Sequence, residues 1–324
     1  MTRTRPATIR DVAHRAGVST KTVSRVINRE SYVTESTRTR VLRAIEALSY
    51  RPNPAAQNLR RTTSRSIAVV VEDISEPFAA EVTLAVEHAV DEGTTVIVSS
   101  SMGDPRREAT ILATLAARQV DGIILAPTQA PRPRLLHRMG RTAVVCVDRP
   151  VPGEPTDAVL SDNARGMQEA VETLLEQGHQ RVAYMGDSSR VFTQVERLRG
   201  YRAALESRSI DLDPALIYEH RPDVERTRRH LAWLTKLPDP PTAIVSGNSL
   251  TTLAMIRADF NAGLDCFIGF DDFPLADFVC GGVSVVAQDA AALGGEATRT
   301  LLRRIANDAA PLKTSRLATQ LVLR

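Results

Sequence analysis

The chain has 324 residues, a formal net charge of +3 and three cysteines. No part of it approaches the ~18 consecutive apolar residues of a membrane-spanning helix, and the arginines near its N-terminus precede no apolar segment of the kind found in secretion signals. Cys146, Cys266 and Cys280 show no Cys-x-x-Cys spacing, which favours reduced thiols over a disulfide or a metal site. The sequence therefore predicts a cytoplasmic protein with no cofactor and no metal, and it excludes an integral membrane protein.

The positive charge is concentrated in the first fifth of the chain. Residues 1–65 contain fourteen Lys or Arg against four Asp or Glu, which gives about +10, whereas the remaining residues contain 27 against 34, which gives about −7. A segment of this charge suits the phosphate backbone of nucleic acid. Such a charge run can also be only a solvated surface, but here the charges lie on amphipathic helices with a core of their own, so we favour a nucleic-acid partner.

Residues 8–28 predict a helix, a tight turn and a second helix. Thr8 and Ser19 each stand before a segment of helical apolar periodicity and can act as N-caps, and Gly17 suits the turn. The apolar positions that would face inward are Ile9, Val12, Ala13, Ala16, Val23, Val26 and Ile27. These features are typical of a helix-turn-helix.

The outward face of the second helix is polar, basic and short, as a helix lying in the major groove requires. Small side chains at Thr22 and Ser24 suit close phosphate contact, whereas Arg25 can bind a guanine through two hydrogen bonds. The residues of this region that we expect to contact DNA are Thr8, Ser19, Thr20, Lys21, Thr22, Ser24, Arg25 and Asn28.

A third helix is predicted to begin at Thr34 or Ser36 and to close a three-helix headpiece. Its apolar stripe comprises Val41, Leu42, Ala44, Ile45 and Leu48. The prolines of residues 50–54 break the helical pattern, and residues 55–61 can form one or two further turns. We therefore expect a DNA-binding headpiece over 1–52 and a hinge helix with a linker over 53–65.

The remaining residues alternate apolar runs with amphipathic segments, which predicts βαβ units and an α/β fold. The runs that predict buried strands are 66–71, 95–98, 122–125, 143–147, 181–185, 242–245 and 266–270. The segments that predict helices lie near 78–92, 105–118, 132–139, 165–177, 194–207, 224–234 and 250–260. About 260 residues fit two doubly wound lobes better than one large sheet, and a ligand is expected in the cleft at the carboxyl ends of their strands.

Polar side chains follow several of the predicted strands. Asp73, Asp148, Asn248 and Asp271 stand after strand ends, and Arg197 lies near the start of a helix. Carboxylates accept hydrogen bonds from hydroxyl groups and arginine donates through a planar fork, so such groups converging in a cleft would select a small polyol.

A structural role is the alternative for each of these residues, because a strand-end aspartate can also cap the next helix. We favour that role for Asp73 and Asp272, and we favour ligand contact for Arg197 and Asp271. The aromatic residues that could stack on a ligand, although each also fits the core, are Phe78, Phe192, Phe270 and Phe273.

Two sets of motifs carry a family resemblance. The headpiece reads Thr-Ile-x-Asp-Val-Ala-x-x-Ala-Gly-Val-Ser-x-x-Thr-Val-Ser-Arg-Val-Ile-Asn at residues 8–28, followed by Tyr50-x-Pro52-Asn53. In the body the motifs stand at residues 72–78, 120–124, 147–150, 162–163, 197–201 and 269–272. In this order they resemble LacI/GalR-type transcriptional regulators over essentially the whole chain.

The resemblance implies a helix-turn-helix headpiece, a hinge helix and a two-lobed, periplasmic-binding-protein-like body of doubly wound parallel sheets. The body would be an effector-binding and dimerisation domain over 66–324. Its N-subdomain would span about 66–161 plus 290–315, and its C-subdomain about 162–289 plus 316–324.

The function implied is that of a ligand-controlled repressor, a homodimer bound to a pseudopalindromic operator. The residues that the resemblance assigns to a sugar-like or nucleobase effector are Asp148, Arg197, Asn248, Asp271 and Gln288, and we add Phe78 as an aromatic residue that could stack on it. Those it adds to the DNA interface are Asn53, Gln57 and Leu59, with Leu59 inserted into the minor groove; packing of Leu59 against its own linker is the alternative.

The resemblance also implies an assembly. Helices after Ile74 and Pro274 would form the dimer face. Residues 316–324 contain no leucine heptad, so we expect a dimer rather than a tetramer.

The chain departs from the family pattern at four positions. Glu76 stands where Asn is common and adds a carboxylate at the cleft mouth, and Ser249 stands where Asp is common. Ser161 offers no aromatic platform for a sugar ring, and Gln57 replaces an arginine common in the hinge. These departures leave the identity of the effector open.

Two other classes of protein fit the sequence less well. A solute-binding protein of a sugar transporter would share the two-lobed body but not the basic headpiece. An enzyme would need a catalytic constellation, and the sequence contains no His-Glu-x-x-His, no Gly-x-Ser-x-Gly and no glycine-rich phosphate loop with lysine. We therefore expect a regulator and not an enzyme.

Overall fold

The computed structural model describes residues 7–27, 32–50, 64–129, 136–188, 190–258, 266–307 and 309–324. The chain divides into two compact units, Met1–Ser64 and Arg65–Arg324, and each is described by itself. The expected hinge over 53–65 falls almost entirely outside the described residues, as do the expected DNA contacts Asn28, Asn53, Gln57 and Leu59.

The described residues of the first unit form the helices α1 (Ile9–Ala16), α2 (Thr20–Ile27) and α3 (Glu35–Ala47). Thr8 and Asp11 form a capping box at the start of α1: the Asp11 carboxylate accepts from the Thr8 amide at 2.7 Å, and Thr8 Oγ1 accepts from the Asp11 amide at 3.4 Å. Gly17 ends α1 in the left-handed region, with φ 65°. Ser19 Oγ accepts from the Thr22 amide at 3.1 Å and so caps α2. The caps and the turn predicted from the sequence are confirmed.

The core of this unit is a single apolar cluster at the centre of the three helices. Val12, Val23 and Val41 are fully buried there, one from each helix. Leu42, which we expected in the apolar stripe of α3, instead exposes 51% of its surface. It lies one residue, about 100° around the helix, from Val41, so it leaves the inward face that Val41 shares with Ala44.

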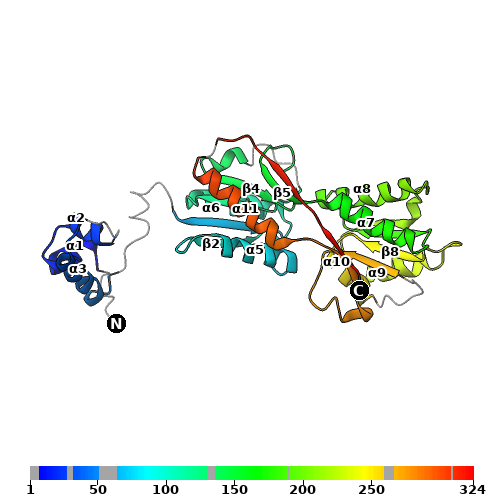
Figure 1. Ribbon diagram of the computed structural model, residues 1–324, viewed down its shortest axis with the longest axis horizontal. Coiled ribbons are helices and arrows are strands. Elements are labelled where there is room, and N and C mark those ends of the chain that lie inside the picture. The colour runs from blue at the N-terminus through cyan, green and yellow to red at the C-terminus, as the bar shows by residue number, and fades with distance from the viewer. Residues whose placement is uncertain are drawn as a thin grey trace. The chain divides into compact units, whose positions relative to one another are not determined.

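The second unit is built on two six-stranded sheets, each covered by helices on both faces (Figure 1). The order of the first sheet is β11-β5-β4-β3-β1-β2, and all of its pairs are parallel. Its strands are β1 (Ser66–Val71), β2 (Thr95–Ser100), β3 (Gly122–Leu125), β4 (Ala143–Val147), β5 (Asp157–Ser161) and β11 (Thr314–Leu317). Its helices are α5 (Pro77–Ala89), α6 (Pro105–Ala117), α11 (Ala290–Ile305) and the 3₁₀ helix η1 (Leu136–Met139).

The alternation of side chains along β1 explains why its sequence is apolar without interruption. Ile67, Val69 and Val71 pack into one core with α5 and α11, whereas Ala68 and Val70 pack into another with α6. A strand buried on both faces needs an apolar residue at every position.

The second sheet has the order β12-β10-β9-β8-β6-β7, with β12 antiparallel to β10. Its strands are β6 (Val182–Gly186), β7 (Ile217–Glu219), β8 (Ala243–Ser246), β9 (Cys266–Phe270), β10 (Ser284–Ala287) and β12 (Gln320–Val322). Its helices are α7 (Asn163–Glu176), α8 (Phe192–Ser207), α9 (Val224–Leu234) and α10 (Ser249–Arg257), with short 3₁₀ turns at η2 (Pro214–Leu216) and η3 (Val279–Gly281). The predicted α/β class, with a helical headpiece and two parallel-sheet lobes, is confirmed.

The strands β5, β7, β10, β11 and β12 were not predicted from the sequence. Four of these have four residues or fewer, too few for a period to be recognised, and β7, β11 and β12 lie at sheet edges. The expected subdomain boundary after residue 315 is also displaced, because β11 belongs to the first sheet as far as Leu317.

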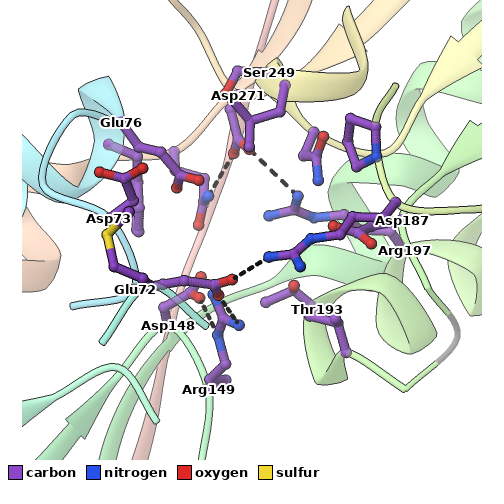
Figure 2. A pocket seen from close by; sticks show the side chains of 18 residues that line it. Glu72, Asp73, Glu76, Asp148, Arg149, Asp187, Thr193, Arg197, Ser249 and Asp271 are labelled. Carbon is purple, nitrogen blue, oxygen red and sulfur yellow. Dashed lines mark hydrogen bonds and ion pairs between the residues drawn. The ribbon is translucent and has the colours of Figure 1, made fainter. Parts of the chain in front are cut away.

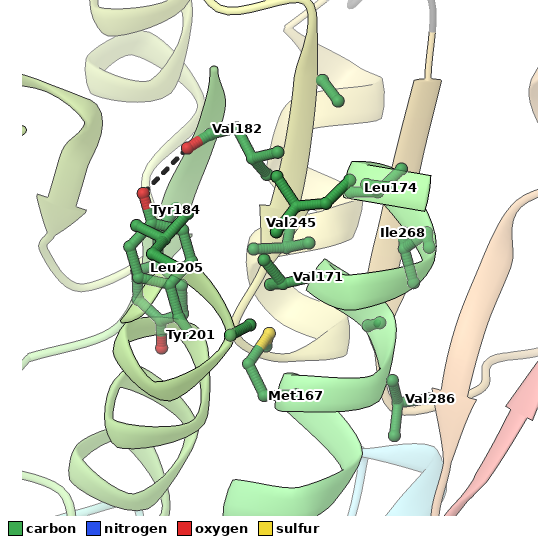
Figure 3. Packing of buried hydrophobic residues seen from close by; sticks show 14 of the residues in the cluster. Met167, Val171, Leu174, Val182, Tyr184, Tyr201, Leu205, Val245, Ile268 and Val286 are labelled. Atoms are coloured by element: carbon green, nitrogen blue, oxygen red, sulfur yellow. Dashed lines mark hydrogen bonds between the residues drawn. The ribbon is translucent and has the colours of Figure 1, made fainter. Parts of the chain in front are cut away.

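Helices α7 and α8 pack closely on one face of the second sheet (Figure 3). Gly200 permits the approach, since a Cβ there would lie 2.0 Å from the Ala164 carbonyl oxygen. Tyr201 is fully buried beside it and donates to the Val182 carbonyl oxygen of β6 at 2.8 Å. These contacts fix α8 against the sheet and thereby set the position of Arg197, one turn earlier on the same helix.

Candidate functional site

A pocket of about 240 Å³ lies where the carboxyl ends of the two sheets meet (Figure 2). The residues that line it follow β1, β2, β4, β6, β7, β8, β9 and β10, or lie in the first turns of α5, α8 and α10. Parallel strands bring their carboxyl ends to one edge of a sheet, so residues far apart in the sequence converge there. The six residues assigned to the effector (Phe78, Asp148, Arg197, Asn248, Asp271 and Gln288) all line this pocket.

Arg197 is held by contacts on every side and is only 3% exposed. Its Nε donates to Asn163 Oδ1 at 2.8 Å, and its Nη1 donates to the Gly247 carbonyl oxygen at 2.6 Å. The same Nη1 lies 3.4 Å from Asp271 Oδ2, and the guanidinium carbon lies 3.7 Å from the centre of the Phe270 ring. The charge is thus compensated by a carboxylate, two further acceptors and an aromatic face.

Asp148 and Asp271 occupy equivalent places in the two lobes, after β4 and β9. Both have a left-handed backbone, with φ 68° and 70°, a conformation that non-glycine residues adopt at a cost. Asp271 Oδ1 accepts from Gln288 Nε2 at 2.6 Å. The two carboxylates therefore face the pocket from opposite lobes, each held by a donor.

Arg149 is a pocket residue that we did not single out from the sequence. Its Nε donates to Asp148 Oδ2 at 2.7 Å, and its Nη1 donates to Glu72 Oε2 at 3.1 Å. Burial lowers the pKa of Arg149, but the charges of Asp148 and Glu72 outweigh burial and leave the pKa raised. The signal available in the sequence was the basic residue directly after Asp148.

Other acidic residues differ in how they are satisfied. Asp73 Oδ1 accepts from the amide and hydroxyl of Ser75 at 2.9 and 2.8 Å, which organises the turn as expected and lowers the pKa of Asp73. Asp272 accepts from the Phe273 amide at 2.9 Å and from Arg324 at 2.8 Å, and it does not line the pocket.

Glu76 and Asp187 line the pocket without a basic partner in hydrogen-bond contact among the described residues. Burial, and then the charge of Glu72, raises the pKa of Glu76 to about 7. Burial also raises the pKa of Asp187. Because both carboxyls are partly buried, they bind protons more readily than exposed carboxyls do.

Asn248 both lines the pocket and caps α10, because its Oδ1 accepts from the Thr251 amide at 2.8 Å. The aromatic candidates separate into two groups. Phe78 lines the pocket, whereas Phe270 lies beneath Arg197, Phe273 is buried in a separate cluster and Phe192 packs against the core of the first lobe.

Ion pairs between described residues join the lobes at two places. Arg316 of β11 contacts Glu196 of α8, with 3.0 Å between Nη1 and Oε2. Glu72, which follows β1, lies 3.9 Å from Arg221, which follows β7. A change in the angle between the lobes would alter both distances.

In the first unit, the candidate DNA-reading residues lie on or beside α2. Thr20 and Lys21 are exposed, and Ser24 and Arg25 are half-buried. Thr22 Oγ1 lies 2.9 Å from Ser19 Oγ. The helix thus turns Val23 and Val26 inward and leaves a polar, basic face.

The described residues form neither a metal-ligand cluster nor a membrane-spanning helix. In that part of the chain, no group of three or more His, Cys, Asp or Glu residues could hold a metal ion. No helix there has the length and apolar character needed to cross a membrane.

Comparisons with known proteins agree with this architecture. The profile of "Bacterial regulatory proteins, lacI family" matches residues 8–53, and that of "Periplasmic binding protein-like domain" matches residues 171–324. The HTH-type transcriptional repressor PurR of Mannheimia succiniciproducens is 31% identical over 98% of each chain.

Two solved structures share the fold over nearly the full length. The lac repressor dimer bound to operator and the anti-inducer ONPF is 26% identical, with a TM-score of 0.86 and coverage of 99% of this chain and 98% of that one. The transcriptional regulator CelR in complex with cellobiose is 30% identical, with a TM-score of 0.72 and coverage of 98% and 99%. This chain therefore belongs to the LacI family of helix-turn-helix transcriptional regulators.

Proposed function

We propose that this protein is a repressor whose affinity for a DNA operator is set by a small molecule bound between the two lobes. The observation that carries the proposal is the convergence of Arg197 and Asp271 from one lobe with Asp148 from the other on a single pocket. Regulation rather than catalysis is the role we assign, in keeping with the regulators to which the chain is similar.

The chemistry of the pocket favours a small, strongly hydrogen-bonding effector. Arginine supplies fixed donors, carboxylates supply acceptors and Asn248 supplies both, so a ligand that lacks hydroxyl or amino groups would leave buried groups unpaired. The cellobiose bound by CelR is a ligand of this kind. Phe78 provides an apolar surface at the pocket wall.

We infer that the effector acts on the angle between the lobes. A ligand that contacts Asp148 and Asp271 together favours one interlobe geometry, and a change in that geometry would alter the distance between Arg316 and Glu196. A ligand shifts such an equilibrium only by its difference in affinity for the two states. The shift would pass to the DNA-binding unit through the residues that connect the two units.

We propose that α2 enters the major groove with Thr20, Lys21 and Arg25 facing the DNA. Thr8, Ser19, Thr22, Ser24 and Asn28 would position the helix on the phosphates. Asn53, Gln57 and Leu59, which lie outside the described residues, would contact the minor groove, with Leu59 as an apolar wedge.

We also propose a homodimer, formed by the segments after Ile74 and Pro274. The first of these is α5, as expected, but the second is a series of turns that leads into η3, so the expectation of a helix there was wrong. Both carry exposed apolar side chains: Ile74 and Leu84 expose 43% and 51% of their surface, and Leu275 and Phe278 expose 66% and 80%. Apolar surface gathered at two places on one unit suits an interface. A dimer also matches the two half-sites of a pseudopalindromic operator.

Replacing Arg25 with alanine should weaken binding to the operator by about 1–3 kcal/mol and relax the preference at one base pair, because a bidentate contact to a base is lost. Fluorescence anisotropy at fixed salt, on operator and on random DNA, measures both effects. Arg43→Ala, an exposed residue of α3, is the matched control. An equal loss on random DNA would make Arg25 a phosphate contact instead.

Replacing Arg197 with alanine should abolish the rise in melting temperature that an effector produces, while specific DNA binding by the first unit persists. Ligands are first found by thermal shift of the full chain with sugars, polyols and nucleobases, since a ligand stabilises the state it binds. Arg202→Ala, exposed on the same helix, should retain the response. A response that survives in Arg197→Ala would place the effector site elsewhere.

Replacing Phe278 with aspartate should raise the dissociation constant of the dimer at least about tenfold, because a large apolar anchor becomes a charge at the interface. Sedimentation equilibrium of the purified protein measures this constant. Leu212→Asp, at a site 40% exposed away from both segments, should leave it unchanged. A wild-type protein that is monomeric, or a Phe278→Asp dimer of unchanged affinity, would refute the interface.

A further inference from the structure

The pocket between the lobes contains more acid than base. The carboxylates among the described residues that line it are Glu72, Asp73, Glu76, Asp148, Asp187 and Asp271, and the guanidiniums are Arg149, Arg197 and Arg221. All three guanidiniums already pair with carboxylates: Arg149 with Asp148 and Glu72, Arg197 with Asp271, and Arg221, at 3.9 Å, with Glu72. The protein itself therefore leaves part of the negative charge of the pocket uncompensated.

The uncompensated negative charge of the pocket is most evident at Glu76. It precedes α5 as the N-cap residue, but its side chain makes no capping hydrogen bond. None of the described residues forms a hydrogen bond or an ion pair with its carboxylate, although the group is half-buried. Figure 2 shows Glu76 beside Asp73 on the wall formed by the first lobe, facing the space between Asp271 and Glu72. An ionised carboxylate in this position accepts hydrogen bonds and donates none.

Gln288 adds a second unused acceptor to the same pocket. Its Nε2 donates to Asp271 at 2.6 Å, and since an ionised carboxylate can only accept, this contact fixes which end of the amide is the oxygen. The Oε1 atom is buried and accepts no hydrogen bond from any described residue. A buried acceptor without a donor costs free energy that a bound ligand can recover.

We propose that the effector carries a protonated amine, as an amino sugar or an aminated polyol does, with its ammonium group bound by Glu76 and Gln288 Oε1. The inference rests on the proposed function of the pocket as the effector site. An ammonium group has three donors and no acceptor, so it satisfies both oxygens at once and supplies the missing positive charge. The hydroxyl groups of the same molecule would bind Arg197, Asp148 and Asn248.

Two other ligand types fit the pocket less well. A neutral polyol donates to the same oxygens but leaves the excess negative charge in place. An anionic ligand, such as a sugar acid, would add charge of the same sign beside Glu76, Glu72 and Asp271. A ligand with an amine has neither disadvantage.

The preference for an amine should depend on pH. The charged groups that act on Glu76 are Glu72, Asp271 and Asp148, which disfavour its ionisation, and Arg149, which favours it. Burial is the largest influence, and together these groups raise the pKa of Glu76 to about 7 in the free protein. The carboxyl is thus mostly ionised at pH 8 and mostly protonated at pH 6, so an alkylammonium ligand should bind more weakly at the lower pH.

The test compares ligands that share a carbon skeleton, in which each charged member differs from the neutral member by one substituent. One series is 1-amino-1-deoxysorbitol, sorbitol and gluconate, and a second is glucosamine, glucose and glucuronate, each repeated with the galactose and mannose configurations. Affinities for the full chain are measured by thermal shift and calorimetry. We expect the ammonium member to bind at least about tenfold more tightly than the neutral member on the skeleton that fits, and the carboxylate member to bind least.

Variants assign that preference to Glu76. Glu76→Gln should remove the tenfold difference and the pH dependence measured with the aminoalditols, while the neutral members keep their affinity. Glu81→Gln, which makes the same charge change at an exposed position of α5, should alter neither. The absence of an ammonium preference on every skeleton, or a preference that survives in Glu76→Gln, would overturn the inference.

The Arg197→Ala variant separates this inference from the proposed function. If neutral and ammonium members bind equally to the wild type and neither binds to Arg197→Ala, the pocket is the effector site and the inference about charge is wrong. If the ammonium members bind to Arg197→Ala as they do to the wild type, the ligand binds elsewhere and both are wrong.

Discussion

The second lobe's side of the pocket depends on the hydrogen bonds and the ion pair made by the buried guanidinium of Arg197. It joins three elements that are distant in sequence: Asn163 at the start of α7, Gly247 after β8 and Asp271 after β9. Burying a charge is costly unless it is paired and hydrogen-bonded. Here every contact that offsets the cost also positions a group beside the pocket, so the stability of the site and its shape come from the same atoms.

The first lobe's side of the pocket is also held together by an arginine, although the residues differ. Arg149 joins Asp148 and Glu72, as Arg197 joins Asp271 and Asn163, and the aspartates of both lobes have a left-handed backbone. Each lobe therefore presents to the pocket a charged wall held by its own ion pairs, and in the mechanism we propose it is the separation between the two walls that changes. A ligand that contacts both walls favours one separation between them, and this is the physical basis of the switch we propose.

The structure could be predicted from the sequence wherever a local pattern determined it. The caps at Thr8 and Ser19 follow from side chains next to the helix they cap, and the strand-end residues of the pocket follow from the direction of parallel strands. Contacts between residues far apart in the chain could not be predicted in this way. Glu72 and Arg149 are 77 residues apart, and nothing in either neighbourhood indicates their ion pair. The short strands at sheet edges likewise depend on the partner strand more than on their own residues.

We propose that a ligand in the pocket and an operator on the headpiece influence each other's binding. The most direct test is reciprocity: the operator is selected from random DNA with the full chain, and its dissociation constant is measured with and without a small molecule that raises the melting temperature. We predict a change of at least about fivefold, and an equal change in the ligand's dissociation constant when operator is present. A ligand that stabilises the protein and leaves the operator affinity unchanged would contradict the account.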